Sequence, residues 1–327
     1  MVEIERISQI KELIIYWCIW YHFFFQMMKH ILSADQYDRE SLKEVFDLTN
    51  KIKSHPENYS NKLSDKVVAV MFYEPSTRTR LSFEAAALKL GAKIITTENA
   101  GSSSSATKGE TIQDSVRVIA GYADAMVMRH KSDTSAIEAA SVNKIPILNG
   151  GAGKGEHPTQ ALLDLYTIRE KIGRLDNLKV AILGDLANGR TIHSLIKLLS
   201  FYDNIKIYGL SKEAFALPQK YVEILKEKNV EYEVCHSFSD LPKDLDVMYH
   251  TRIQSERFEG DFGKEEFIVD KNVLNMFSEN LILLHPLPRV NEISTEVDDD
   301  PRACYFEQAH NGLWVRMALL LQVLNRD

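Results

Sequence analysis

Cysteine is scarce in this chain of 327 residues, which contains only Cys18, Cys235 and Cys304. The three lie far apart in the sequence and are odd in number. They therefore form neither the closely spaced pairs that bind a structural metal ion nor a set of disulfide partners. This excludes a disulfide-stapled secreted domain and predicts a cytoplasmic protein, kept in a reducing compartment, without a metal site.

An excess of positive charge is absent as well. The formal net charge at pH 7 is −7, which argues against a general nucleic-acid-binding protein, because such proteins need a basic surface. Any positive site must then come from a local cluster of Lys and Arg. The hydrophobic content of 45% and the charged content of 26% are ordinary for a soluble globular protein, and the length suggests about two domains.

The densest apolar run, residues 13–25, is too short to cross a membrane. As a helix it would reach roughly 20 Å, whereas the hydrocarbon core of a bilayer is about 30 Å thick. A signal peptide is not favoured, because the preceding residues carry no net positive charge. Residues 1–27 are open to three interpretations: a membrane-surface anchor, an extension that is disordered or packs as an extra helix, or an upstream translation start that is not used. Because Met27 and Met28 could each begin a cytosolic chain, we favour the last and expect no membrane partner.

Short apolar segments alternate with helix-length segments through the rest of the chain, and uncharged, β-branched segments of this kind predict buried strands. The predicted strands are residues 67–73, 93–96, 125–128, 145–148, 179–183, 205–208, 232–234, 247–249 and 281–284. The predicted helices are residues 81–90, 111–121, 159–172, 190–201 and 218–228. Residues 33–53 also have a helical pattern, with Ser41 as a candidate N-cap. The alternation is typical of parallel sheets covered by helices on both faces.

A glycine-rich segment, residues 150–155, interrupts this pattern near the middle of the chain. The interruption predicts two α/β domains, each a doubly wound parallel sheet, with the active site in the cleft between them. We place the first domain at residues 28–158, completed by a C-terminal helix at about residues 312–327. The second domain is placed at residues 159–311.

The most informative motif is Ser76-Thr77-Arg78-Thr79-Arg80, between the strand at 67–73 and the helix at 81–90. Free backbone N–H groups and the helix dipole favour an anion at such a strand-to-helix turn. Arg78 adds a planar fork that can grip a phosphate through two hydrogen bonds. A capped helix with solvated arginines is the alternative. Three hydroxyls and two arginines exceed what a cap requires, so the motif predicts a phosphate site.

A second turn, residues 184–191, looks at first like a dinucleotide site but lacks the Gly-x-Gly-x-x-Gly pattern. Without the second glycine, the backbone cannot approach a pyrophosphate closely. Arg190 at the start of the following helix suits a small carboxylate instead. We therefore expect no nicotinamide cofactor.

Further polar clusters follow the predicted strands at the edge where parallel sheets bind ligands. They comprise Arg129, the pair His157 and Gln160, the pair Arg252 and Gln254, and the Pro286-Leu287 segment. A serine-rich loop, residues 101–110, contains Ser104 and Lys108. Each cluster taken singly has an ordinary structural explanation, such as a flexible loop or a core histidine. Their shared placement at strand ends indicates one site.

Taken in chain order, these motifs closely resemble those of the catalytic chain of aspartate carbamoyltransferase, within the aspartate/ornithine carbamoyltransferase superfamily. The resemblance covers residues 28–327, and the first 27 residues have no counterpart in it. The matching blocks are residues 76–80, 108–111, 127–130, 157–160, 184–191, 251–254 and 285–289.

The sister family, ornithine carbamoyltransferase, shares the phosphate motif but typically has Cys in two blocks where this chain has Thr159 and Pro286. Aspartate carries two carboxylates and calls for several cations, which Lys108, Arg190 and Arg252 supply. An ornithine pocket would need an acid for the side-chain amine. The resemblance thus implies the aspartate enzyme, with an ornithine-type enzyme or a non-catalytic subunit as the alternatives.

The resemblance also implies roles for individual residues. Catalysis falls to Arg78, Thr79, Lys108, Arg129 and His157. Carbamoyl phosphate binds first, in the N-terminal domain, to Ser76, Thr77, Arg78, Thr79, Ser104, Lys108, Arg129, His157, Gln160, Pro286 and Leu287. The second domain binds aspartate, and the aspartate-binding residues are Lys108, Arg190, Arg252, Gln254 and Leu287. Glu74 is expected to stabilise domain closure by pairing with Arg190 and Arg257.

The implied reaction is a direct attack of the aspartate amine on carbamoyl phosphate, as an early step of de novo pyrimidine biosynthesis. No covalent enzyme intermediate, metal ion or organic cofactor is expected, and the departing phosphate accepts the amine proton. The resemblance implies a homotrimer in which Ser104 and Lys108 are donated to the adjacent subunit. It leaves open whether a regulatory chain binds.

Overall fold

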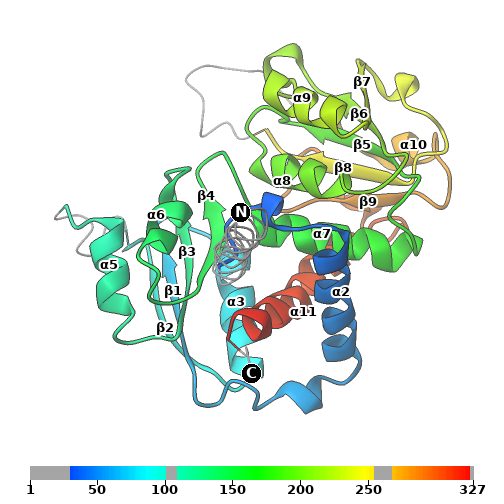
Figure 1. The fold of residues 1–327 in the computed structure, drawn as a ribbon. Helices are drawn as coiled ribbons and strands as arrows, with labels where there is room; N and C mark the ends of the chain where they lie inside the picture. The colour runs from blue at the N-terminus through cyan, green and yellow to red at the C-terminus, as the bar shows by residue number, and fades with distance from the viewer. Residues whose placement is uncertain (1–29, 101–108, 254–266, 325–327) are drawn as a thin grey trace, which may run out of the picture.

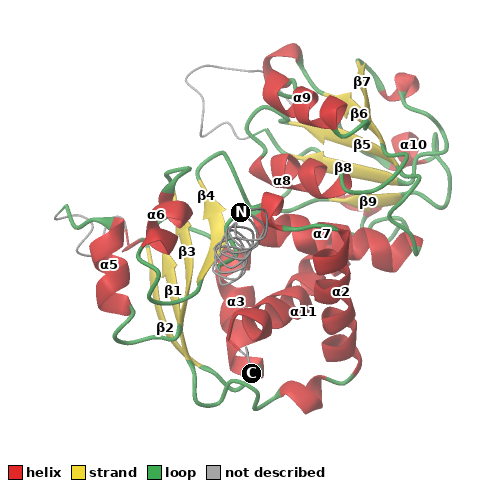
Figure 2. Cartoon of the chain, viewed as in Figure 1, coloured by secondary structure: helices red, strands yellow, loops and turns green. Residues whose placement is uncertain are grey.

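Two parallel sheets organise the molecule in a computed structural model that describes residues 30–100, 109–253 and 267–324. The four-stranded sheet has the order β2-β1-β3-β4 and the five-stranded sheet the order β7-β6-β5-β8-β9, with parallel pairing throughout. The strands are β1 Val67–Phe72, β2 Lys93–Glu98, β3 Ala125–His130, β4 Ile147–Ala152, β5 Lys179–Gly184, β6 Lys206–Leu210, β7 Glu231–Cys235, β8 Val247–Thr251 and β9 Ile282–Leu284. Every predicted strand is present, and the prediction of two doubly wound domains is confirmed (Figures 1 and 2).

Helices cover the faces of both sheets, as Figure 2 shows. They are α2 Arg39–Ser54, α3 Thr77–Lys89, α5 Ile112–Ile119, α6 Ser135–Ser141, α7 Pro158–Ile172, α8 Arg190–Leu199, α9 Gln219–Glu227, α10 Lys271–Leu274 and α11 Tyr305–Leu324. The central strands read as unbroken apolar runs because both of their faces are covered. The edge strand β2 is largely exposed.

Helices α7 and α11 connect the two sheets. α7 is buried along nearly its whole length and contacts β4 on one side and α8 and β9 on the other. α11 packs against α7, α3 and α2, so the last helix of the described residues lies beside one near their start (Figure 1). This is the packing expected of the predicted C-terminal helix, although α11 begins at Tyr305 and not near residue 312. The domain boundary at residues 158/159 stays a proposal.

The N-cap of α2 differs from the prediction. Asp38, not Ser41, is the N-cap, and its side chain accepts the backbone N–H of Ser41 at 2.8 Å. Ser41 occupies the third helical position of this capping box, and its hydroxyl accepts the backbone N–H of Asp38 at 2.9 Å. The two residues are three apart, and both residue types are good caps, so sequence alone did not separate them.

The carboxyl ends of the two sheets meet where α7 begins. Glu74 follows β1, Gly153 follows β4, and Arg190 follows β5 at the start of α8, where its Nη1 donates to the Gly153 carbonyl at 2.7 Å. Among the described residues, no helix is both long and apolar enough to cross a bilayer. Within the same ranges, no cluster of His, Cys, Asp and Glu could hold a metal ion.

Candidate active site

The predicted phosphate motif forms the start of α3. Ser76 is the N-cap residue, but its side chain makes no capping hydrogen bond, and the helix begins at Thr77. The unpaired N–H groups of the first turn thus accompany the side chains of Thr77, Arg78 and Thr79. The Arg80 guanidinium is already engaged, because it pairs with Glu84 at 3.4 Å and with Glu98 at 3.2 Å. Only one of the two motif arginines, Arg78, is left for an anion.

His157 lies next to Thr79, with 3.4 Å between His157 Nε2 and Thr79 Oγ1. Both side chains are buried. Burial, followed by the charges of Arg190, Arg129 and Arg316, holds the pKa of His157 well below its usual range. The imidazole is therefore neutral at pH 7 and can donate one N–H. Its Nδ1 has no hydrogen-bond partner among the described residues.

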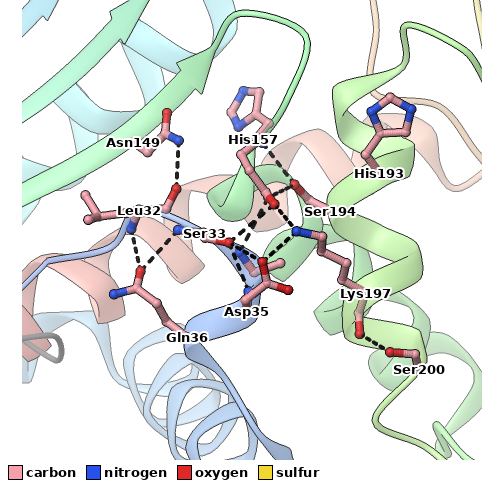
Figure 3. A network of polar contacts seen from close by, with 12 residues as sticks. Leu32, Ser33, Asp35, Gln36, Asn149, His157, His193, Ser194, Lys197 and Ser200 are labelled. Atoms are coloured by element: carbon pink, nitrogen blue, oxygen red, sulfur yellow. Dashed lines mark hydrogen bonds and ion pairs between the residues drawn. The ribbon is translucent and has the colours of Figure 1, made fainter. Parts of the chain in front are cut away.

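A polar network holds the backbone of His157 in place (Figure 3). The His157 N–H donates to Ser194 Oγ on α8 at 3.0 Å, and Ser194 in turn donates to the carboxylate of Glu156. Lys197 Nζ, one turn further along α8, bonds Glu156 at 2.5 Å and Asp35 at 2.6 Å. The network joins the segment before α7 to α8 and to the short helix η1 Ala34–Gln36. Sequence reasoning did not identify these supporting residues.

Glu74 lies between two arginines. Its Oε2 is 3.7 Å from Arg129 Nε on β3 and 3.6 Å from Arg190 Nη1 on α8. The structure thus brings Glu74 to Arg190 as expected and adds Arg129, which was not expected as a partner. Gly151, with φ of +123°, lets the guanidinium groups approach the backbone: a Cβ there would lie 3.2 Å from Arg190 Cζ and 3.3 Å from Arg129 Nη1.

A pocket opens beside this ion-pair cluster. It has a volume of about 430 Å³ and is lined by Glu74, Lys131, Asp133, Gly153 and Lys154. This is the size range of small-molecule sites. The lining comes from the segments that follow β1, β3 and β4, and Gly153 and Lys154 belong to the glycine-rich segment itself.

The Pro286-Leu287 segment is held in an unusual conformation by His285. Leu287 has a φ of +54°, in the left-handed region, and its N–H donates to His285 Nδ1 at 2.8 Å. Because Nδ1 accepts, the proton of the neutral imidazole lies on Nε2, which bonds Glu292 at 2.8 Å. Burial lowers the pKa of His285, in keeping with this neutral form. Pro286 and Leu287 themselves are half-buried.

Arg252, just after β8, lies close enough to Arg78 for the two charges to interact. Desolvation, and after it the charge of Arg252, lowers the pKa of Arg78. A like-charge pair of this kind favours an anionic ligand between or beside the two groups. Gln160 is buried as well, in the first turn of α7. Of the remaining predicted site residues, Ser104, Lys108, Gln254 and Arg257 lie outside the described residues.

Comparison with protein-family models decides the family. Residues 29–170 match the carbamoyl-phosphate-binding domain of aspartate/ornithine carbamoyltransferase, and residues 176–323 match its aspartate/ornithine-binding domain. The chain belongs to the aspartate/ornithine carbamoyltransferase family. This confirms the resemblance drawn from the motifs.

Proteins similar to this chain carry the name aspartate carbamoyltransferase or aspartate transcarbamoylase. The aspartate carbamoyltransferase catalytic subunit of Clostridium novyi is 44% identical over 300 residues, which is 90% of this chain and 98% of that protein. The catalytic subunit of M. jannaschii aspartate transcarbamoylase has a TM-score of 0.83 at 42% identity, covering 91% of this chain and 99% of that one. Aspartate transcarbamoylase from Trypanosoma cruzi, solved with carbamoyl phosphate and aspartate, has a TM-score of 0.84 at 37% identity, covering 90% and 96%. The chain is a carbamoyltransferase, and it belongs with the aspartate carbamoyltransferases.

Proposed function

We propose that this chain transfers the carbamoyl group of carbamoyl phosphate to L-aspartate, giving N-carbamoyl-L-aspartate and phosphate, an early step of pyrimidine biosynthesis. The observation that carries the proposal is the meeting of Thr79, Arg129, His157 and Arg190 where the carboxyl ends of the two sheets face each other. Parallel sheets bind their ligands at this edge. The family match supports one substrate for each sheet, because its two domains are named for carbamoyl phosphate and for aspartate/ornithine.

Carbamoyl phosphate binds at the start of α3. Its phosphate accepts hydrogen bonds from Ser76, Thr77, Arg78 and Thr79, and Ser104 and Lys108 close over it. Charge-assisted hydrogen bonds contribute roughly 1.5–3 kcal/mol each, so several of them offset the desolvation of a dianion. The N-terminus of α3, where the Ser76 side chain makes no capping hydrogen bond, supports this placement.

The carbamoyl oxygen is polarised by Thr79, Arg129 and His157, which stabilise the developing oxyanion. A neutral His157 serves this purpose as a donor, and its depressed pKa keeps it from acting as a charged acid near pH 7. Gln160 and the backbone carbonyls of Pro286 and Leu287 accept the amide protons of the carbamoyl group.

Aspartate binds through its carboxylates to Lys108, Arg190, Arg252 and Gln254, with Leu287 at the junction with the first substrate. The amine then attacks the carbonyl carbon, the C–N bond forms, and the bond to phosphate breaks. The departing phosphate takes the amine proton. Much of the rate gain comes from holding the two substrates in this geometry.

We further propose a cytoplasmic homotrimer in which Ser104 and Lys108 of one chain complete the site of the next. A cyclic arrangement lets every chain both lend and receive one loop. A regulatory chain remains compatible with this assembly. The chain divides into a carbamoyl-phosphate domain at residues 28–158, completed by the C-terminal helix, and an aspartate domain at residues 159–311.

Formation of N-carbamoyl-L-aspartate by the purified full chain tests the proposed function. We expect turnover from carbamoyl phosphate and L-aspartate without added cofactor, and a near-complete loss in Arg78→Ala. Arg80→Ala is the matched control, since that arginine pairs within its own domain. A folded, oligomeric protein without activity would indicate a non-catalytic subunit and overturn the proposal.

A further inference from the structure

A fully buried carboxylate, Asp164 on α7, receives hydrogen bonds from three elements of the fold. Gln160 Nε2 donates to Asp164 Oδ1 at 2.8 Å, and Gln308 Nε2 on α11 donates to the same oxygen at 2.6 Å. The Tyr249 hydroxyl on β8 donates to Asp164 Oδ2 at 2.8 Å. We refer to Asp164, Gln160, Gln308 and Tyr249 as the Asp164 cluster.

The Asp164 carboxylate fixes which end of the Gln160 amide faces the active site. A carboxylate only accepts hydrogen bonds, so the NH₂ group of Gln160 must be the end that contacts it. The Gln160 Oε1 consequently points away from Asp164, and it makes no hydrogen bond to any described residue. In this orientation the Oε1 of Gln160 is available to a ligand as an acceptor.

Gln308 connects the same carboxylate to the Pro286-Leu287 segment. Its Oε1 accepts the backbone N–H of His285 at 2.8 Å, while its NH₂ group is held by Asp164. His285 in turn accepts the N–H of Leu287 at 2.8 Å. The backbone carbonyls of Pro286 and Leu287 are therefore positioned by a chain of hydrogen bonds that begins at Asp164.

We propose that Asp164 is a positioning residue that makes the site selective for a carbamoyl group over an acyl group. Through Gln160 directly, and through Gln308 and His285 indirectly, it directs acceptor oxygens at the place where the –NH₂ group of the carbamoyl substrate lies. An acetyl group has the same shape but a methyl group there, and it leaves those acceptors unpaired. Sites that lose a hydrogen-bond partner in this way reject the analogue strongly. The inference rests on the proposed function.

The orientation persists in either protonation state of Asp164. Burial raises the pKa of Asp164 to about 7, against the lowering effect of its hydrogen bonds and of the Arg316 charge. Both amides bond Oδ1, whereas Oδ2 faces only the Tyr249 hydroxyl within the cluster. A proton on Oδ2 would therefore be donated to Tyr249 and leave Gln160 and Gln308 unchanged.

Variants of the full chain separate this role from simple core packing. Asp164→Leu has a similar volume but no acceptor, so both amides become free to turn. Asp164→Asn keeps one carbonyl oxygen that can accept from both Gln160 and Gln308. Tyr249→Phe removes a hydrogen bond from the same carboxylate without touching either amide, and it serves as the matched control.

The probe is acetyl phosphate, measured as a competitor of carbamoyl phosphate, with inorganic phosphate as a competitor that reports the phosphate subsite alone. We expect the preference for carbamoyl over acetyl phosphate to fall about tenfold or more in Asp164→Leu, as the loss of one or two well-aligned hydrogen bonds implies. The preference should stay within about twofold of the wild type in Asp164→Asn and Tyr249→Phe, and inhibition by inorganic phosphate should be the same in all four proteins.

An unchanged preference in folded Asp164→Leu would overturn the inference. If that variant does not fold, Gln308→Leu decides the question, because it cuts the link to His285 but leaves Gln160 bonded to Asp164. Its preference should fall about threefold or more, as expected when one of the links is lost, and no fall would overturn the inference. Failure of the wild type to use carbamoyl phosphate would instead contradict the proposed function.

Discussion

The Glu74 carboxylate, just after β1, lies 3.6 Å from the Arg190 guanidinium at the start of α8. The pair joins the two sheets of the protein at the edge where their ligands bind. Arg190 is nine-tenths buried or more, so its charge is poorly screened by water. Contacts of this kind stabilise the observed relative position of the two sheets.

Removing the Glu74 carboxylate should weaken aspartate use. We expect Glu74→Ala to leave the fold intact and to raise the aspartate concentration for half-maximal rate by roughly tenfold, because a partly buried ion pair contributes on the order of 1–2 kcal/mol. Steady-state kinetics at saturating carbamoyl phosphate measure this. Glu84→Ala breaks an ion pair within the first domain and is the control. Unchanged aspartate kinetics in Glu74→Ala would remove this residue from the mechanism.

Arg252 should matter to aspartate much more than to carbamoyl phosphate. Arg252→Ala removes a charged donor to a substrate carboxylate, so we expect kcat/KM for aspartate to fall on the order of a hundredfold. The dissociation constant of carbamoyl phosphate, measured without aspartate, should change less than about threefold. Lys226→Ala removes one positive charge from the exposed face of α9 and controls for net charge. Equal losses for both substrates would contradict the assignment of Arg252 to aspartate.

Asp164 should make the stability of the wild type depend on pH. Its pKa is raised to about 7 in the folded protein because of burial. The folded protein thus holds a proton that the unfolded chain releases between about pH 4 and 7, and stability decreases as the pH rises through this range. The shift corresponds to about 4 kcal/mol. The melting temperature of Asp164→Asn should rise relative to that of the wild type as the pH increases from 5 to 8. A constant difference would mean that Asp164 does not titrate in this range.

The proposed sharing of sites between chains predicts complementation. Lys108→Ala and Arg78→Ala should each be nearly inactive. When the two variants are dissociated, mixed and reassembled, a chain with intact Arg78 can receive Lys108 from a neighbour, and some complete sites form. Activity should return to a substantial fraction of the wild-type value. Mass measurement of the mixed trimers is the control, and no recovery in confirmed mixed trimers would rule out the shared site.

The fold was largely predictable because its strands are buried on both faces. Segments such as β1 and β5 are continuous apolar runs, and their alternation with helices implies parallel sheets. Local details, such as the N-cap of α2 and the short helix α6, were harder to predict from the sequence. Asp38 and Ser41 are both good N-caps in the same capping box, and only the geometry separates them. The short helix α6 was not predicted, since Ser135–Ser141 spans only two turns and has no side-chain cap.

The candidate site was predictable where the chemistry lies in a contiguous motif and not where it depends on tertiary contacts. Arg78, Thr79 and His157 follow from motif blocks. The different orientation of Arg80 depends on Glu98, which comes from a neighbouring strand. Asp164 and Gln308 are 144 positions apart in the sequence. Nothing local connects them, although an acidic residue within the apolar face of α7 was a signal that a buried partner must exist.

The choice between L-aspartate and L-ornithine decides which amino acid this chain carbamoylates. The measurement compares initial rates of the purified full chain with L-aspartate and with L-ornithine at saturating carbamoyl phosphate, with the carbamoylated product identified in each case. Because Arg190 and Arg252 offer positive charge to a dicarboxylate, we predict a preference for aspartate of at least about a thousandfold in kcat/KM, since ornithine lacks the second carboxylate and the charge-assisted contacts that it makes. Comparable turnover of both amino acids, or a preference for ornithine, would contradict the account.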